Sequence, residues 1–378
     1  MCDNRTVAPQ VIESQLDLGR RVAQGRDAAG LTQAELAEAI GIDRTAVAKI
    51  ESGARRVSAT ELVALASVLD RPVDWFVIES PSAVVSRRQD PAVGGRSRSL
   101  DAYVERISRD AEFLLGEGVL SARERHSLPM PMDYAQAEAL AESARSLMGV
   151  PRGPLMDLQA AVENVGLLGF SLDLGAENGD GAYISLDGWG VAVVNGSVDP
   201  GRRRFDLAHE LGHHLVGDAY APELDVMTDG QTERMLNAFV PYVLMPREDI
   251  TEVWADFSQA DRRLGAIAIA TRFRASWTAV CSHLCNLGLI DTEERGSLSG
   301  APPRKGDMLE LGERWVTELE PPSVPPDYGR RVVGAYRTGK LTAAKSIDLL
   351  WGTIQERDLP EPVAIPLEGL QREFEPLH

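Results

Sequence analysis

Cysteine is scarce in this sequence, and a long apolar run is missing. Only three cysteines occur among 378 residues, Cys2, Cys281 and Cys285, which argues against a disulfide scaffold of the secreted type. No apolar run is long enough to span a bilayer, and the first residues lack a basic segment followed by an apolar stretch. We therefore expect a cytoplasmic protein with no membrane partner.

Basic residues are also in deficit. Lys and Arg number 39 against 57 Asp and Glu, which gives a formal net charge of −18. Sequence-independent binding to nucleic acid depends on the neutralisation of phosphates by Lys and Arg, so this charge opposes it. Any contact with DNA must be confined to a local surface.

The two internal cysteines lie four residues apart around His283, in the segment TAVCSHLCNLGLI. This spacing could place a metal site on one face of a helix. A helix that buries small apolar cysteines is the favoured interpretation, because free cysteine behaves as a small hydrophobic residue.

The length of the chain predicts two or three domains, and the patterns divide it further. Residues 14–79 show helical periodicity, whereas 80–99 are rich in Ser, Pro, Gly and Arg and are predicted to be a linker. The segments that follow are 100–255, with scaffold helices, a small sheet and a histidine-bearing helix; 256–298, a helix-turn-helix-like element; and 299–378, a helical acidic module of unknown role. The expected fold class is α+β, mostly α.

Three short β-rich runs precede the histidine-bearing helix. They are LGFSLDL, GAYISLD and WGVAVVNG, separated by Gly, Asp and Asn, and they predict a small sheet before a helix that begins near Pro200.

Helix starts are marked twice in the N-terminal module. Thr32 is followed by Glu35, and Ser58 by Glu61, at the spacing of a capping box. In this motif the hydroxyl and the carboxylate each satisfy an amide that has no partner in the first turn.

A tight turn is predicted between two helices of this module. Gly41 can adopt the left-handed backbone that ends one helix, and Asp43 can cap the next, RTAVAKIES. The apolar positions predict one shared core of Leu36, Ala37, Ile40, Ile42, Val47, Ile50, Leu62, Leu65, Leu69 and Trp75. The second helix of the pair then presents polar and basic side chains outward, as a recognition helix does in the major groove.

The segment TQAELAEAIGIDRTAVAKIESGARRVSATELVALASVLDRPVDWF resembles the XRE, or Cro/C1-type, helix-turn-helix family over residues 16–79. The resemblance implies a DNA operator as partner of this segment and a homodimer bound to two half-sites. It assigns DNA contacts to Gln33, Arg44, Thr45 and Lys49, and contacts with the DNA backbone to Arg55 and Arg56.

A metal-binding pattern occurs in RRRFDLAHELGHHLVGD. His209 and His213 are four residues apart, so on a helix both imidazoles lie on the same face and can share one ion. Glu210 points toward the same cavity but slightly aside, where it can accept a proton from water. A helix with two surface histidines is the alternative, and it is disfavoured because Leu207, Ala208, Leu211 and Leu215 predict a largely buried helix.

Two histidines require a third protein ligand. The acidic residues downstream are Asp218, Glu223, Asp225, Asp229 and Glu233. We favour Glu233, because it lies on the next predicted helix, TERMLNAFVPYVLMP, and 233 − 213 = 20 residues suffice for a loop and a helical return. An ordinary carboxylate at a helix start is the alternative for Glu233, and AYAPELDVMTDG is expected to be a loop.

Residues from about 133 to 290 resemble the ImmA/IrrE family of regulatory metallopeptidases, which implies a zincin-like domain. The resemblance is carried by AEALAESARSLMGVPRGPLMDLQAAVENVG, WGVAVVNG, RRRFDLAHELGHHLVGD and ERMLNAFVPYVLMP. It assigns zinc to His209, His213 and Glu233, and the role of catalytic acid/base to Glu210. The chain departs from the family pattern at Pro241, which is expected to interrupt the second helix.

In a catalytic site of this kind, zinc lowers the pKa of water toward about 7 and Glu210 carries the proton to the leaving amine. Mn²⁺ or Fe²⁺ would accept the same ligands. The sequence does not identify the group that stabilises the oxyanion, although Tyr242, His214 and Arg202 to Arg204 are near in sequence. The preceding strands could bind an extended polypeptide by edge pairing.

The leading hypothesis is a DNA-binding transcriptional regulator with a zinc-dependent endopeptidase site that cleaves a partner repressor in a regulatory or stress response. The substrate class and the setting follow from the resemblance alone. One alternative is a transcription factor whose metal domain is sensory or structural. Another is an antitoxin-type interaction protein whose acidic C-terminal module binds the partner.

Overall fold

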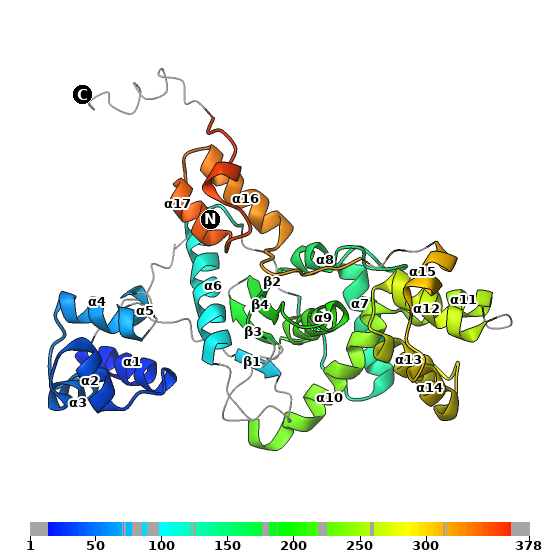
Figure 1. Cartoon of the computed structure of the whole chain (residues 1–378), viewed down its shortest axis with the longest axis horizontal. Coiled ribbons are helices and arrows are strands. Elements are labelled where there is room, and N and C mark those ends of the chain that lie inside the picture. Colours follow the sequence, from blue (N-terminus) through cyan, green and yellow to red (C-terminus); the bar gives the residue numbers. More distant parts are fainter. Residues whose placement is uncertain are drawn as a thin grey trace, which may run out of the picture. The chain divides into compact units, whose positions relative to one another are not determined.

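A computed structural model gives the fold. It describes residues 14–69, 71, 73–77, 85–88, 98–121, 123, 126–175, 181–186, 188–217, 225–257, 261–312, 314 and 316–363. The chain forms two compact units, Met1–Ser82 and Ala83–His378 (Figure 1), which are considered one at a time. Helices predominate and one small sheet is present, so the predicted α+β, mostly α class is confirmed.

The first unit consists of helices α1 (Gln15–Ala28), α2 (Gln33–Ile40), α3 (Arg44–Glu51), α4 (Ala59–Val68) and α5 (Val73–Val77). Both predicted capping boxes form, at the starts of α2 and α4. Gly41 ends α2 with a φ of 71°, as its predicted left-handed role requires. Asp43 occupies the N-cap position of α3, but its side chain makes no capping hydrogen bond, which differs from our expectation.

The predicted core of this unit is confirmed. Ile40, Ile42 and Leu62 are partly buried at its border, and the other predicted members are buried together with Phe76. The short turns between helices therefore suffice to bring one apolar face of each helix into a common cluster.

The second unit contains a four-stranded sheet in the order β1-β3-β4-β2. Its strands are β1 (Val85–Arg88), β2 (Leu167–Leu172), β3 (Gly181–Leu186) and β4 (Trp189–Asn195). β2 runs parallel to β4, whereas β3 is antiparallel to both of its neighbours. The last three strands match the predicted β-rich runs. β1 lies inside the segment that was predicted to be a linker. Its four residues, VSRR, carry too little apolar alternation to indicate a strand.

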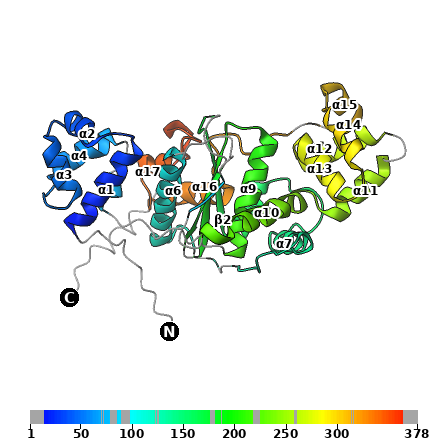
Figure 2. The ribbon, with the colours of Figure 1, turned by 90° about the horizontal axis from the view of Figure 1, so that it is seen from below.

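The two faces of the sheet pack against different helices (Figure 2). α9 (Pro200–Val216) lies on one face and α6 (Arg98–Gly116) on the other. Side chains alternate between the two cores as strand geometry requires: Ala192 and Val194 of β4 join the α9 side, whereas Val191 and Val193 join the α6 side.

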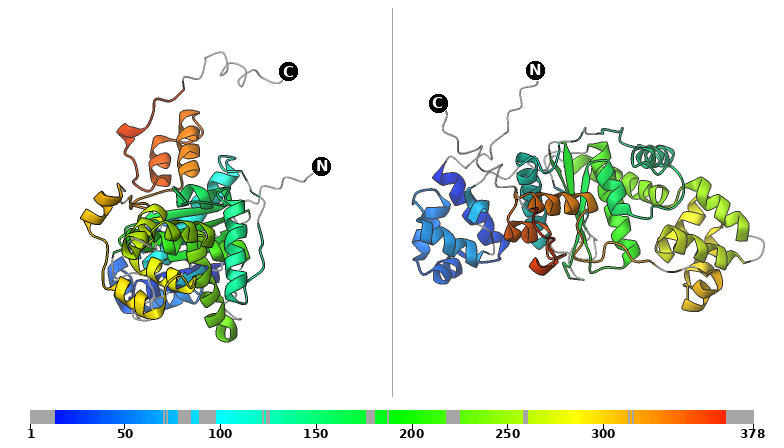
Figure 3. Two further views of the ribbon diagram at one scale, coloured as in Figure 1. Left: turned by 90° about the vertical axis from the view of Figure 1, so that its right-hand side faces the viewer. Right: turned by 90° about the horizontal axis from the view of Figure 1, so that it is seen from above.

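The C-terminal helices complete the α6 face of the sheet. α16 (Pro326–Arg337) and α17 (Ala343–Leu349) contribute Tyr328, Val332 and Leu349 to that core, and a short 3-10 turn, η1 (Glu356–Asp358), follows (Figure 3). Glu163 on α8 (Leu158–Asn164) accepts hydrogen bonds from the backbone N–H groups of Asp327 and Tyr328, at 2.8 and 2.7 Å. This part of the C-terminal module is therefore structurally integrated with the sheet.

The remaining helices lie on the α9 side of the unit. α7 (Tyr134–Leu147) packs along α10 (Asp225–Leu244), and beyond them lie α11 (Arg247–Phe257), α12 (Arg262–Phe273), α13 (Trp277–Asn286), α14 (Thr292–Ser299) and α15 (Lys305–Leu311). None of the described helices is long and apolar enough to cross a bilayer.

Two sequence expectations were wrong in this region. α10 continues through Pro241, and it begins at Asp225, within the segment expected to be a loop. Packing of α10 against α7 and α9 maintains the helix through Pro241, and the turn after it is closed by the N–H of Met245, which donates to the Pro241 carbonyl at 2.8 Å.

Candidate metal centre

α9 is a helix with strong signals at both ends. The Asp199 side chain accepts a hydrogen bond from the N–H of Gly201 at 2.9 Å, and Pro200 stands where a missing N–H costs nothing. Gly217 ends the helix with a φ of 65°. Most of the helix between these caps is buried, which holds its histidines in fixed positions.

Three glycines of the sheet allow α9 to approach closely. A Cβ atom added to Gly169 of β2 would lie 2.7 Å from Leu207, and one added to Gly190 of β4 would lie 2.5 Å from His214. A Cβ atom at Gly181 of β3 would lie 3.0 Å from Oε1 of Glu210. The sheet-facing side of α9 therefore carries Glu210, whose carboxyl group is adjacent to the start of β3.

Another face of α9 meets α10. A Cβ atom at Gly212 would lie 3.1 Å from Leu236 and 3.3 Å from Phe239, so glycine at this position permits close packing of the two helices. This contact brings Glu233 of α10 next to the histidines of α9.

The structure brings His209, His213 and Glu233 together. The two Nε2 atoms are 3.1 Å apart, and each lies 3.2 Å from one carboxylate oxygen of Glu233. Zinc ligands at about 2.0–2.1 Å in a tetrahedron are separated by about 3.3 Å. Two imidazoles and a carboxylate at these separations fit three corners of such a tetrahedron.

The environment of the group is asymmetric. His209 and His213 are almost fully buried, whereas 29% of the Glu233 side chain is exposed. Burial opposes ionisation of Glu233, but its hydrogen bonds with the two histidines outweigh burial and lower the pKa of its carboxyl group. The group thus has one side that solvent reaches.

Among the described residues, this trio is the one cluster of His, Cys, Asp and Glu with metal-ligand spacing. Of the other acidic residues considered as third ligand, Asp218 and Glu223 lie outside the described residues. Asp225 and Asp229 lie on α10, and their side chains are outside the described part of the structure.

The side chains considered for the oxyanion have other partners. His214 contacts the Tyr183 hydroxyl at 3.1 Å and the Val165 carbonyl at 3.0 Å. Tyr242 packs edge-on against the ring of His283, with ring centroids 5.0 Å apart.

The three arginines of α9 also make contacts outside the histidine group. Arg202 pairs with Asp206, Arg203 donates to the Val198 carbonyl, and Arg204 is buried against Glu318. Sequence proximity was therefore a poor guide to the surroundings of the His209, His213 and Glu233 group.

Gly181 was missed by sequence reasoning. A glycine at the start of a strand often marks close approach of another group. Nothing in the sequence, however, connects Gly181 with Glu210, because their contact depends on how α9 lies across the sheet.

His283 and the two cysteines near it follow the favoured interpretation. His283 is buried and its Nε2 donates to the Met245 carbonyl at 2.9 Å, while Cys281 is buried in the same core. Burial lowers the pKa of His283 to about 4. These residues support the packing of α13.

The predicted DNA-contacting residues of the first unit fall into two groups. Arg44, Thr45 and Lys49 of α3 and Arg56 after it are exposed. Gln33 instead donates to Glu51 at 2.7 Å, and Arg55 pairs with Glu61 at 2.6 Å. A cationic surface on and after α3 is thus presented to solvent.

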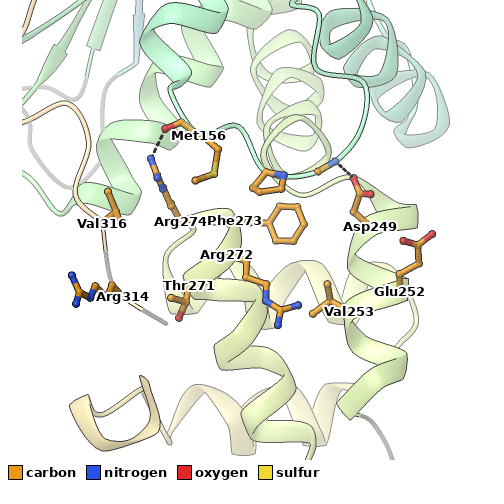
Figure 4. Close-up of a pocket in the computed structure, with 12 residues that line it drawn as sticks. Met156, Asp249, Glu252, Val253, Thr271, Arg272, Phe273, Arg274, Arg314 and Val316 are labelled. Atoms are coloured by element: carbon orange, nitrogen blue, oxygen red, sulfur yellow. Dashed lines mark hydrogen bonds between the residues drawn. The ribbon is translucent and has the colours of Figure 1, made fainter. Parts of the chain in front are cut away.

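A separate pocket of about 480 Å³ is lined by residues of α11 and α12 and of neighbouring segments (Figure 4). Phe273 and Met156 supply apolar lining, and Arg272, Arg274 and Arg314 supply cations. Asp249 in its wall accepts a hydrogen bond from the Gly153 N–H at 2.8 Å. The residues that line the pocket include none of the histidine-glutamate trio.

Comparison with known proteins identifies two segments. The family model described as Helix-turn-helix matches residues 22–76, and the peptidase M78 model, described as IrrE N-terminal-like domain, matches residues 162–284. No curated protein matches the chain.

Two solved structures are similar to parts of the chain. The restriction-modification controller protein C.AhdI from Aeromonas hydrophila is 35% identical over 16% of this chain and 94% of that chain, with a TM-score of 0.16. PlcR from Bacillus thuringiensis, solved with the peptide PapR7 and DNA, is 14% identical over 88% of this chain and 91% of that chain, with a TM-score of 0.16. Together, the two family matches show that the chain joins an XRE-type helix-turn-helix domain to an ImmA/IrrE-like domain of the M78 metallopeptidase family.

Proposed function

We propose that this protein is a DNA-binding regulator that cleaves a polypeptide, a partner repressor, at a zinc site. The observation that carries the proposal is the spacing of His209, His213 and Glu233, whose ligand atoms all lie within 4.8 Å of one another. The match to a metallopeptidase family supports the same chemistry. DNA binding is supported by the helix-turn-helix match and by the exposed cations on and after α3.

Each residue of the centre has a distinct role in this proposal. His209 and His213 would hold zinc from one face of α9, and Glu233 would complete the ligand set from α10. Bound zinc would polarise a peptide carbonyl and make water acidic enough to lose a proton near neutral pH.

Glu210 moves the proton. Its carboxylate lies on the sheet-facing side of α9, next to Gly181. From this position it accepts a proton from water and returns it to the amine that leaves the cleaved peptide bond.

The first experiment is elemental analysis of the purified chain, three variants of the candidate site and one control variant. We expect about one zinc per chain in the wild type and in Glu210→Gln, and loss of zinc in His213→Ala and Glu233→Ala, because each removes one of three ligands. Glu142→Gln, an exposed change on α7, is the matched control. A wild type without metal would contradict the proposal.

The second experiment tests turnover. Protein N-termini are mapped in the native cells with the wild type and with Glu210→Gln at equal expression. New N-termini in a DNA-binding repressor that depend on Glu210 are expected. Zinc retained in both proteins, with identical N-termini and regulatory output, would favour a sensory or structural metal domain.

A further inference from the structure

The outer edge of the sheet next to Glu210 is covered by a strand of the chain itself. β1 pairs antiparallel with β3, with Val85 opposite Ile184 and Arg88 opposite Gly181. Neighbouring strands are about 4.8 Å apart, so the backbone of Arg88 lies one strand spacing from Gly181. Gly181 is the residue whose added Cβ would be 3.0 Å from Oε1 of Glu210. β1 therefore ends beside the proposed proton carrier.

The opposite edge of the sheet is different. β2 forms its border and is held there by a two-residue bridge, in which Ser171 and Ser323 exchange backbone hydrogen bonds of 2.9 and 2.8 Å. The face of β2 nearest α9 contacts Leu207 through Gly169, one helical turn before Glu210. A strand added to the outer edge of β2 would therefore lie away from Glu210. A strand that pairs with β3, in the position that β1 occupies, lies next to Glu210.

An extended polypeptide binds a sheet by adding a strand to a free edge, and its backbone then makes the hydrogen bonds of a sheet neighbour. A substrate that presents a peptide bond beside Glu210 in this way needs the position that residues 85–88 hold. Both cannot occupy the edge of β3 at once, because each backbone N–H and C=O of that edge serves one neighbour.

We infer that β1 is an internal competitor of the substrate: residues 85–88 cover the substrate-binding edge of β3, and a polypeptide must displace them before it is cleaved. This inference rests on the proposed peptidase function. β1 has four residues in register with β3, whereas β4 has six, so the internal strand is the weaker of the two neighbours of β3. A short edge strand of this kind can open without unfolding the sheet.

The position of β1 in the sequence suits it to regulate substrate binding at β3. Val85 follows Val77, the last residue of α5, by 85 − 77 = 8 residues. The strand is therefore part of the covalent connection between the helix-turn-helix unit and the sheet. Access of a substrate to β3 therefore depends on the same segment that connects the helix-turn-helix unit to the proposed peptidase site.

The test uses the full chain in a Glu210→Gln background, so that no cleavage consumes the probe. The probe is a fluorescent peptide, AVVSRRQD, with the sequence of residues 83–90. The variant is Ser86→Pro with Arg87→Pro. Adjacent residues of a strand direct their N–H groups to opposite sides, so one of the two prolines removes a donor to β3. The matched control is Ser86→Thr with Arg87→Val, which preserves the backbone donors.

Fluorescence anisotropy should show at least about tenfold tighter binding of the peptide to the proline variant than to the wild type, with the control equal to the wild type. Equal affinity for all three chains would overturn the inference.

Hydrogen exchange of backbone amides supplies a second measurement, which reports on the pairing of β1 with β3 directly. The amides of Gly181 to Ile184 that point toward β1 should exchange faster in the proline variant, and the peptide should restore their protection. Unchanged exchange in α9 shows that the variant is folded. In the wild type, saturating peptide should expose the amides of residues 85–88, and persistent protection there would contradict displacement.

Zinc content separates this inference from the proposed function. If the chain binds no zinc but the proline variant binds the peptide more tightly, the proposed peptidase function is refuted, whereas the inference that β1 covers the binding edge of β3 stands. A chain that binds zinc but shows no gain in peptide binding would refute the internal competitor alone.

Discussion

The two units of the chain position their functional side chains in opposite ways. In the helix-turn-helix unit, four of the six candidate DNA contacts are exposed, and they lie on α3 and after it: Arg44, Thr45, Lys49 and Arg56. In the sheet-containing unit, His209 and His213 are buried and need Glu233 from a second helix. The first arrangement depends on signals close in sequence, whereas the second depends on packing between distant segments.

This difference predicts separable consequences of mutation. Changes on the α3 surface should alter DNA binding without altering the fold, because those side chains contribute little to the core. Changes far in sequence from α9 should alter the stability of the sheet-containing unit, because remote segments hold α9 in place.

The largest effect is expected at Glu318. It bridges Arg204 of α9 and Arg274, and only 14% of its side chain is exposed. Glu318→Gln would leave two guanidinium groups without their shared counter-charge, and breaking a buried pair in this way costs about 3–5 kcal/mol. Chemical denaturation that follows the sheet-containing unit measures the loss. Glu310→Gln, an exposed change on α15, is the control. A loss equal to that of the control would show that α9 does not depend on this remote segment.

The next effect concerns DNA binding alone. Arg44→Ala should weaken binding to an operator selected from a random pool by about 10–100-fold at fixed salt, or about 1–3 kcal/mol, because a base contact would be lost. Arg20→Ala on α1, with 70% of the side chain exposed, is the matched control. Anisotropy titration measures affinity, and zinc content measured on the same samples should not change. If Arg44→Ala and Arg20→Ala weaken binding equally, α3 is not the recognition helix.

A pH-dependent effect should belong to the sheet-containing unit. His283 is buried, and its pKa is lowered to about 4, mainly by burial. The unfolded chain takes up a proton near pH 6.5 and the folded chain does not, so folding stability falls as the pH drops from about 6.5 toward 4. Between pH 7 and pH 5 the contribution of His283 is about 2 kcal/mol.

His283→Gln keeps a donor for the Met245 carbonyl but does not titrate in this range. Its stability should therefore decline by about 2 kcal/mol less than that of the wild type between pH 7 and pH 5. Denaturation curves at pH 7 and pH 5 give the free energy of unfolding of each protein. Subtracting the change in the variant from the change in the wild type removes the contribution of all other acids and histidines. Parallel curves would show that His283 is protonated in the folded chain.

Sequence reasoning succeeded where the determining signals were local. The capping boxes of Thr32 and Ser58 and the left-handed Gly41 followed from pairs or single residues within one turn. The positions of β2, β3 and β4 followed from apolar runs between turn residues. In both cases a few neighbouring residues determine the backbone.

It failed where the determinant was a contact between distant segments. Pro241 predicted an interruption of α10, but packing of α10 against α7 and α9 maintains the helix. β1 exists because β3 offers it an edge, and its own residues carry no strand signal. Glu233 could be favoured over its neighbours by position, but its approach to both histidines depends on the close contact of Leu236 and Phe239 with Gly212.

The smallest effect should be confined to α2. Thr32 and Glu35 satisfy each other's backbone N–H groups, at 2.7 and 3.2 Å. Thr32→Ala removes one of these bonds and should lower the opening free energy of α2 by about 1 kcal/mol, which corresponds to roughly fivefold faster amide exchange. Glu38→Gln on the same helix has no capping role and serves as control. Because the helix starts of this unit depend on local bonds, exchange in α9 should stay at its wild-type rate. Faster exchange in α9 as well would mean that the two units are energetically coupled, and the contrast between local and long-range construction would then fail.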